Sequence, residues 1–253
     1  MGTGISAHGR ELWWFFVALA LLSVPFYVVG PLLGSLPGMP VELPGAALMF
    51  VVPTLAALIV AARPRVDWSL RSALRRQPCP TWVWAVALVV VPMIVAASSG
   101  GLDTPNEAIA QVGVLIVAYL IAALLEEIGW TGFVLQRLLP LIGELGAGAL
   151  IGAVWALWHI IPLVQRGDSL SLILAQSAFS VAFRMLLVRL TVASRGTIWP
   201  AVIGHAAFNV AWSLSPDSGT LYNPWVAAGL TILIWSALYM MRITTKPSLP
   251  TGS

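Results

Sequence analysis

The sequence is poor in charged residues and has almost no cysteine. Only 9% of its 253 residues are Asp, Glu, Lys or Arg, whereas soluble domains usually carry about 25%. Because 59% of the residues are apolar, a soluble chain of this length could not bury enough of its apolar surface. Cys79 is the only cysteine, which excludes an intramolecular disulfide and a paired-cysteine metal motif. The composition therefore predicts a protein that lies in a lipid bilayer.

Long apolar runs, separated by proline and glycine, divide the chain. A helix needs about 20 residues to cross the hydrocarbon core, and its backbone groups must be hydrogen-bonded within the segment. We predict an all-α, polytopic membrane protein with about eight transmembrane helices in one membrane domain, residues 1–253. The expected spans are residues 12–33, 45–62, 82–98, 110–138, 145–164, 170–193, 197–214 and 225–242.

The basic residues predict the orientation of the chain, because cytoplasmic loops carry an excess of Arg and Lys. With the N-terminus inside, the arginines of residues 63–76 fall on the cytoplasmic side, as do Arg137, Arg189 and Arg195. Among the loop arginines only Arg166 falls outside. Both termini are therefore expected in the cytoplasm. The same rule explains the net charge of +3, so we expect no nucleic acid as a partner.

A few ionisable residues interrupt the apolar spans. Each costs about 2.5–3.5 kcal/mol near the bilayer centre, so such residues are usually functional. Taken singly, a histidine or asparagine here can also be a hydrogen-bonding contact between helices. These polar residues lie in the fourth, fifth and seventh predicted spans: Glu126 and Glu127, His159, His205 and Asn209.

The spacing of these residues suggests a shared polar pocket. His205 and Asn209 are four residues apart, so they lie on one helical face, and both can donate hydrogen bonds to an oxyanion. Glu126 and Glu127 diverge by about 100° around the helix, so only one can enter the same pocket. A carboxylate and an imidazole held together can take a proton from water and return it to a leaving group. The pattern predicts general-base hydrolysis.

Three sequence motifs carry a family resemblance. EEIGWTGFVLQRL, WALWH and HAAFN occur in this order on separate spans. They resemble the CPBP (ABI) family of intramembrane proteases, which includes CAAX prenyl endopeptidases and bacterial proteins linked to bacteriocin processing or self-immunity. The resemblance covers about residues 110–212 as the catalytic block. It implies an endopeptidase whose substrate is a membrane-associated or lipidated protein or peptide.

The resemblance also implies roles for the residues at matching positions. Glu126 would activate water with the help of His159. His205 and Asn209 would stabilise the oxyanion of the tetrahedral intermediate. Glu127 would hold the site in shape.

One position departs from the family pattern. The family has an arginine four residues after the second glutamate, where this chain has Thr131. An arginine at that spacing can pair with the carboxylate, so Glu127 lacks its expected partner, and a lost partner in a buried pair costs about 3–5 kcal/mol. We hypothesise that Arg184, from the sixth span, pairs with Glu127. The alternative is that Arg184 extends toward the cytoplasmic face.

Two histidines and a carboxylate can in principle form a catalytic zinc site. The set would be Glu126, His159 and His205. We favour hydrolysis without a metal or other cofactor, because no His-Glu-x-x-His helix occurs in the sequence and asparagine is a poor zinc ligand.

Two other classes of function remain open. One is a proton-coupled transporter with the glutamates and histidines as a relay, although no inverted repeat is visible in the sequence. The other is a weakly active homologue that acts as an immunity or partner-binding protein, which Thr131 favours. The short loops and the lack of an organelle signal suggest a prokaryotic inner membrane.

Overall fold

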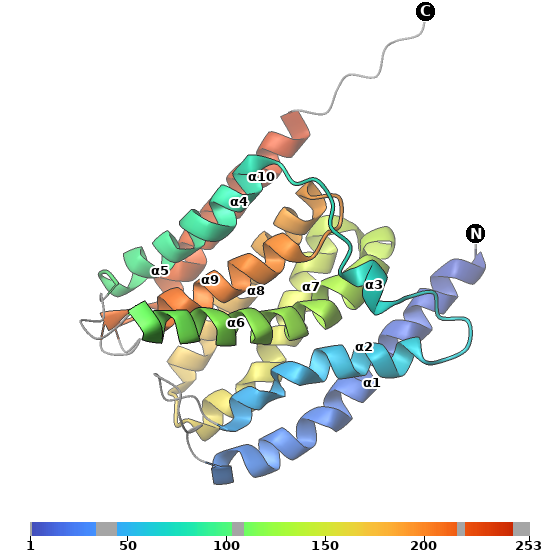
Figure 1. Cartoon of the computed structure of the whole chain (residues 1–253), viewed down its shortest axis with the longest axis horizontal. Helices are drawn as coiled ribbons and strands as arrows, with labels where there is room; N and C mark the ends of the chain where they lie inside the picture. The colour runs from blue at the N-terminus through green and yellow to red at the C-terminus, as the bar shows by residue number, and fades with distance from the viewer. Residues whose placement is uncertain (1, 34–44, 103–108, 217–220, 245–253) are drawn as a thin grey trace, which may run out of the picture.

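The computed structural model describes residues 2–33, 45–102, 109–216 and 221–244. All regular secondary structure in these ranges is helical, which confirms the predicted all-α class. The helices pack side by side as a bundle, with the last helix at one edge (Figure 1). The elements are α1 Gly2–Leu33, η1 Gly45–Val51, α2 Val52–Ala61, α3 Leu70–Ala73, α4 Thr81–Ala85, η2 Val86–Val90, α5 Val91–Ser99, α6 Ile109–Gly129, η3 Trp130–Leu135, α7 Gln136–Gln165, α8 Leu170–Ala193, α9 Trp199–Ser213 and α10 Pro224–Thr244.

Five helical stretches in the described ranges are long and apolar enough to cross a membrane. The predicted count of eight differs because the fourth and fifth predicted spans share one stretch of 54 residues, Val112–Gln165. The second predicted span is a shorter apolar helix, Leu48–Ala61, and the seventh is α9, of 15 residues. The count of eight and the orientation of the termini stay predictions. The five stretches are Ala7–Leu32, Thr81–Ser99, Val112–Gln165, Leu170–Ala193 and Pro224–Met241.

Gly143 interrupts the longest helical stretch. Its backbone has φ 70° and ψ −179°, a conformation that a residue without a Cβ adopts readily. Pro140 lies three residues before it. The break therefore falls where the sequence predicts the boundary between the fourth and fifth spans.

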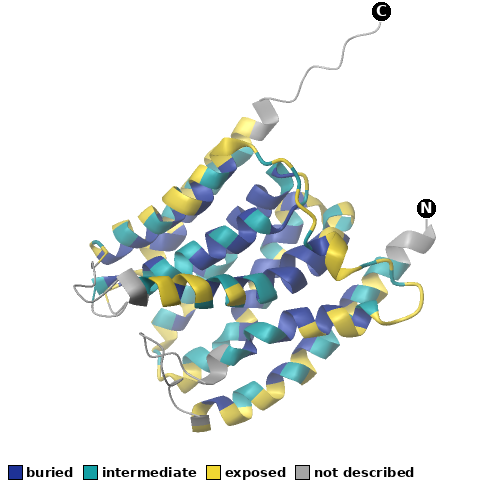
Figure 2. Ribbon diagram, in the orientation of Figure 1, coloured by how far each residue is buried: buried dark blue, intermediate teal, exposed yellow. Residues whose placement is uncertain are grey.

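Large apolar side chains cover the outside of the bundle. Leu32 is 81% exposed, and Leu21 and Leu233 are each 68% exposed. The buried residues lie on the facing sides of the inner helices, whereas the outer helices show many exposed positions (Figure 2). An apolar surface of this extent would promote aggregation in water, but it is well solvated by lipid chains.

The centre of the bundle consists of α6, α7, α8 and α9. α6 packs along α9, and α7 packs along α8 (Figure 1). Gly152 of α7 permits the close approach to α8, because a Cβ at this position would lie 2.8 Å from the Cα atom of Val181 and 3.3 Å from the Cβ atom of Arg184. The polar residues singled out in the sequence lie on these four helices.

Replacement of Gly152 by alanine is expected to push α7 and α8 apart. We expect a loss of about 1–3 kcal/mol in the free energy of unfolding, typical of an overpacked core, seen as a lower melting temperature in detergent. Gly229→Ala in α10 is the control, because nothing lies within 4 Å of its added Cβ. Equal melting temperatures for the two variants would contradict the tight α7–α8 contact.

Candidate active site

Glu127 lies near the end of α6 and is completely buried, with 0% of its surface exposed. Nη1 of Arg184, from α8, donates to both carboxylate oxygens, at 2.8 Å to Oε1 and 2.7 Å to Oε2. Nδ1 of His205, from α9, lies 2.9 Å from Oε1. The hydroxyl of Thr131 donates to Oε2. One carboxylate therefore ties together side chains from three helices.

The hypothesised ion pair between Glu127 and Arg184 is present in the structure. The alternative, an Arg184 that extends toward the cytoplasmic face, is wrong, because its side chain is 0% exposed. Thr131 stands where the family has arginine and contributes a hydroxyl to the same carboxylate. The positive charge of the family arginine thus comes from a different helix.

The local helix geometry changes directly after the two glutamates. Residues Trp130–Leu135 form a π-helical segment, η3, between α6 and α7. Such π-bulges occur frequently at functional sites, because they insert an extra residue into a turn and re-aim the side chains around it. Thr131 lies within this segment, so the π-bulge places its hydroxyl on Glu127.

Glu126 has a separate environment from its neighbour. It is 8% exposed, and its Oε2 accepts a hydrogen bond of 2.9 Å from the indole nitrogen of Trp155. Within the described ranges, its Oε1 makes no hydrogen bond. Adjacent residues of a helix point about 100° apart, so the two glutamates have different surroundings. Both oxygens of Glu127 are hydrogen-bonded, whereas Glu126 keeps one oxygen available.

Trp155 contacts three of the four residues proposed as catalytic. Besides its bond to Glu126, its backbone carbonyl lies 2.8 Å from Nδ1 of His159. Its ring lies 4.9 Å from the His159 ring and 5.5 Å from the His205 ring, both edge-on. The guanidinium of Arg184 lies over the same indole, 4.5 Å from the ring centroid. Trp155 therefore gathers the two histidines and Glu126 around one side chain.

The partners of the two histidines determine which nitrogen carries a proton. A carbonyl oxygen and a carboxylate only accept, so His159 and His205 each donate from Nδ1. Neither Nε2 atom forms a hydrogen bond with another described residue. The second ring nitrogen of each imidazole is therefore available for water or substrate.

Asn209 lies one turn after His205 on α9 and is half-buried. Its side chain forms no hydrogen bond within the part of the chain that the structure describes. The structure thus places Glu126, His159 and His205 around Trp155, but gives no contact that joins Asn209 to them. The shared pocket that the sequence suggests stays a prediction.

Trp155 is the residue whose role the sequence reasoning missed. The spacing of four residues places Trp155 and His159 on one face of a helix. The structure adds an indole N–H that bonds to Glu126. This bond follows a general rule, because the N–H group of a buried tryptophan usually donates to a hydrogen-bond acceptor.

The possible zinc ligands in the sequence are Glu126, His159 and His205. In the described ranges, no three His, Cys, Asp or Glu side chains are gathered in a way that could hold a metal ion. The three side chains therefore do not fit a zinc site in this arrangement, and we derive no reaction step through a metal.

The Glu127–Arg184 pair should show strong energetic coupling. We expect Arg184→Met to lower the free energy of unfolding by about 3–5 kcal/mol, because it leaves a buried carboxylate without its cation. The double variant Glu127→Gln with Arg184→Met removes both charges and should be more stable than Arg184→Met alone. Melting temperatures of the single and double variants in detergent form a double-mutant cycle. Additive effects of the two changes would contradict the pairing.

Comparison with known proteins identifies the family that part of the chain matches. No curated protein matches the chain. A family model described as type II CAAX prenyl endopeptidase Rce1-like matches residues 108–211. These residues run from the start of α6 to α9 and include every residue of the site described above. The chain is an integral membrane protein, and over residues 108–211 it matches the Rce1-like CAAX prenyl endopeptidase family, as its sequence motifs predict.

Proposed function

We propose that the protein is an intramembrane endopeptidase that hydrolyses a peptide bond near the C-terminus of a prenylated, membrane-associated protein. The observation that carries the proposal is the arrangement around Trp155, which holds Glu126, His159 and His205 together. Each of the three keeps one atom without a hydrogen bond to the described residues. These are the atoms that a water molecule and a peptide carbonyl need. We also propose that the membrane is a prokaryotic inner membrane.

In the proposed reaction, Glu126 is the general base. Its free oxygen takes a proton from water as the water oxygen attacks the peptide carbonyl carbon. Nε2 of His159 accepts a hydrogen bond from the same water and orients it. When the C–N bond breaks, Glu126 passes the proton to the leaving amine. The products are a new carboxylate and a new amine.

The developing oxyanion needs hydrogen-bond donors in a site with little water. Doubly protonated His205 donates from Nδ1 to Glu127 and from Nε2 to the oxyanion. The amide of Asn209, one turn along α9, is the second donor. Glu127, Arg184 and Thr131 do not react in this scheme. They fix the orientation of the His205 ring.

The two alternatives are less well supported. The weakly active, partner-binding homologue was favoured by the missing arginine at position 131, but Arg184 supplies a guanidinium to the same carboxylate. A proton relay needs a chain of titratable groups, whereas Glu127 is already occupied by three donors.

Loss of the general base should abolish turnover. We expect Glu126→Gln to lower kcat by about 10²–10⁴-fold, because the amide keeps an acceptor for the Trp155 indole but cannot take a proton. The measurement is hydrolysis of a fluorogenic prenylated peptide by the purified protein in neutral detergent. The melting temperature should stay close to that of the wild type. Equal rates for the variant and the wild type would rule out the proposed reaction.

Removal of the indole N–H should have a smaller effect. Trp155→Phe keeps an aromatic ring between the histidines but leaves Oε2 of Glu126 without its donor. We expect kcat to fall by about tenfold, in line with the loss of one hydrogen bond to a charged group. Trp225→Phe is the matched control, because Trp225 is an exposed residue of α10. A kcat for Trp155→Phe equal to that of the control would show that the hydrogen bond does not position Glu126.

A further inference from the structure

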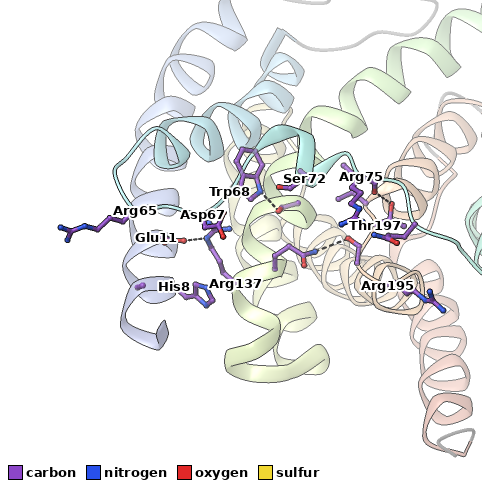
Figure 3. A pocket seen from close by; sticks show the side chains of 17 residues that line it. His8, Glu11, Arg65, Asp67, Trp68, Ser72, Arg75, Arg137, Arg195 and Thr197 are labelled. Atoms are coloured by element: carbon purple, nitrogen blue, oxygen red, sulfur yellow. Dashed lines mark hydrogen bonds and ion pairs between the residues drawn. The ribbon is translucent and has the colours of Figure 1, made fainter. Parts of the chain in front are cut away.

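A polar cavity of about 500 Å³ opens at one end of the bundle. It lies between the start of α1, the segment that contains α3, the π-helical segment η3 and the connection between α8 and α9 (Figure 3). The indole nitrogen of Trp68 donates to the carbonyl of Gly132 inside it. The predicted topology assigns the surrounding loops to the cytoplasmic side. A volume of this size is in the range of ligand-binding pockets.

The charges that line this cavity do not balance. Glu11 forms an ion pair of 2.6 Å with Arg137, and Asp67 interacts electrostatically with the same guanidinium. The three other arginines that line the cavity form no ion pair within the described residues. They are Arg65, Arg75 and Arg195. The cavity therefore carries a positive excess that attracts an anion.

Backbone geometry holds two of these arginines at the rim. Arg65 has φ 70° and Arg195 has φ 56°, and they are the only described residues other than glycine with positive φ. This conformation is uncommon for residues with a side chain and often marks functional positions. Figure 3 shows the two arginines on opposite sides of the cavity, with Arg75 beside Thr197. The hydroxyl of Thr197 donates to the backbone carbonyl of Arg75 at 3.1 Å.

The cavity is close to the candidate site along the same helical stretch. Gly132, which lines the cavity, follows Thr131 and comes six residues after Glu126. At the α-helical rise of 1.5 Å per residue, this separation is at most about 9 Å along the helix, because the wider π-helical turn of η3 rises less per residue. Three extended residues of a peptide span about 10 Å. The separation along the helix between Glu126 and the cavity therefore matches the length of three extended peptide residues.

We propose that this cavity binds the C-terminal α-carboxylate of the substrate, an inference that rests on the proposed function. Guanidinium groups bind carboxylates through charge-assisted, often bidentate hydrogen bonds. A free carboxylate three residues after the cleaved bond matches the C-terminal Cys-a-a-X arrangement of prenylated proteins. The cavity would thus set the distance between the cleaved bond and the end of the chain. A peptide that continues beyond this point would be a poor substrate.

The test compares two prenylated peptides that differ only in a free C-terminal carboxylate or a C-terminal amide. Binding is measured with fluorescent peptides and purified Glu126→Gln protein in neutral detergent, so that it does not depend on hydrolysis. We expect the acid to bind about tenfold or more tightly than the amide. The double change Arg75→Gln with Arg195→Gln should weaken binding of the acid to the level of the amide and leave the amide unchanged. In protein with Glu126 intact, the double change should raise KM for the acid with little effect on kcat.

Arg71→Gln is the matched control, because Arg71 is an exposed arginine of the same segment that does not line the cavity. Equal binding of acid and amide would overturn the proposal. If the double variant lost binding of the acid and of the amide equally, the proposal would also be overturned. The same holds if the double variant lost only its binding to phosphatidylglycerol vesicles, because the arginines would then bind the membrane surface. Preference for the acid without hydrolysis by the wild type would leave the carboxylate site standing and refute the proposed function.

Discussion

The buried ion pair between Glu127 and Arg184 is the constraint on which the rest of the site depends. Both side chains are completely buried, inside a bundle whose surroundings are lipid. A charge in such a place must be paired, because an isolated one costs several kcal/mol. The pair therefore fixes α6 against α8, and through the bond from His205 it fixes α9 as well. The orientation of His205 follows from the pairing of a carboxylate that does not itself react in the proposed scheme.

The two adjacent glutamates have different roles because of helical geometry. Among the described residues, Glu127 is bonded to three side chains, whereas Glu126 accepts a hydrogen bond from Trp155 alone. Because neighbouring residues point about 100° apart, the chain can use one carboxylate to hold the helices and offer the other to a ligand. The two bonds from Trp155, one through its indole and one through its carbonyl, connect Glu126 with His159. The arrangement that results is suited to moving a proton over a short distance.

Much of the fold and of the candidate site could be predicted from the sequence, because unpaired backbone groups and charges cost a large free energy in a membrane. Apolar runs predict helices, and the threonine at position 131 leads to the hypothesis that Arg184 supplies the missing partner of Glu127. The role of Trp155 was harder to predict, because many tryptophans lie in apolar spans and the sequence does not show which of them faces a carboxylate. The π-helical segment at Trp130–Leu135 and the cavity near Gly132 also escaped prediction. Both arise from contacts between segments far apart in the chain.

Because Arg184 comes from α8 and not from the helix of Glu127, the site depends on the packing between helices. An arginine four residues after the glutamate would pair within one helix, so the pair would survive small shifts between helices. Here the guanidinium comes from α8, and its place depends on the packing of α8 against α7. Gly152 contributes to that packing, because its hydrogen leaves room for Val181 and for the Cβ atom of Arg184. The charge that orients His205 is therefore coupled to the α7–α8 contact, which also holds the buried ion pair between Glu144 and Arg189, and changes in that contact reach the site through Arg184.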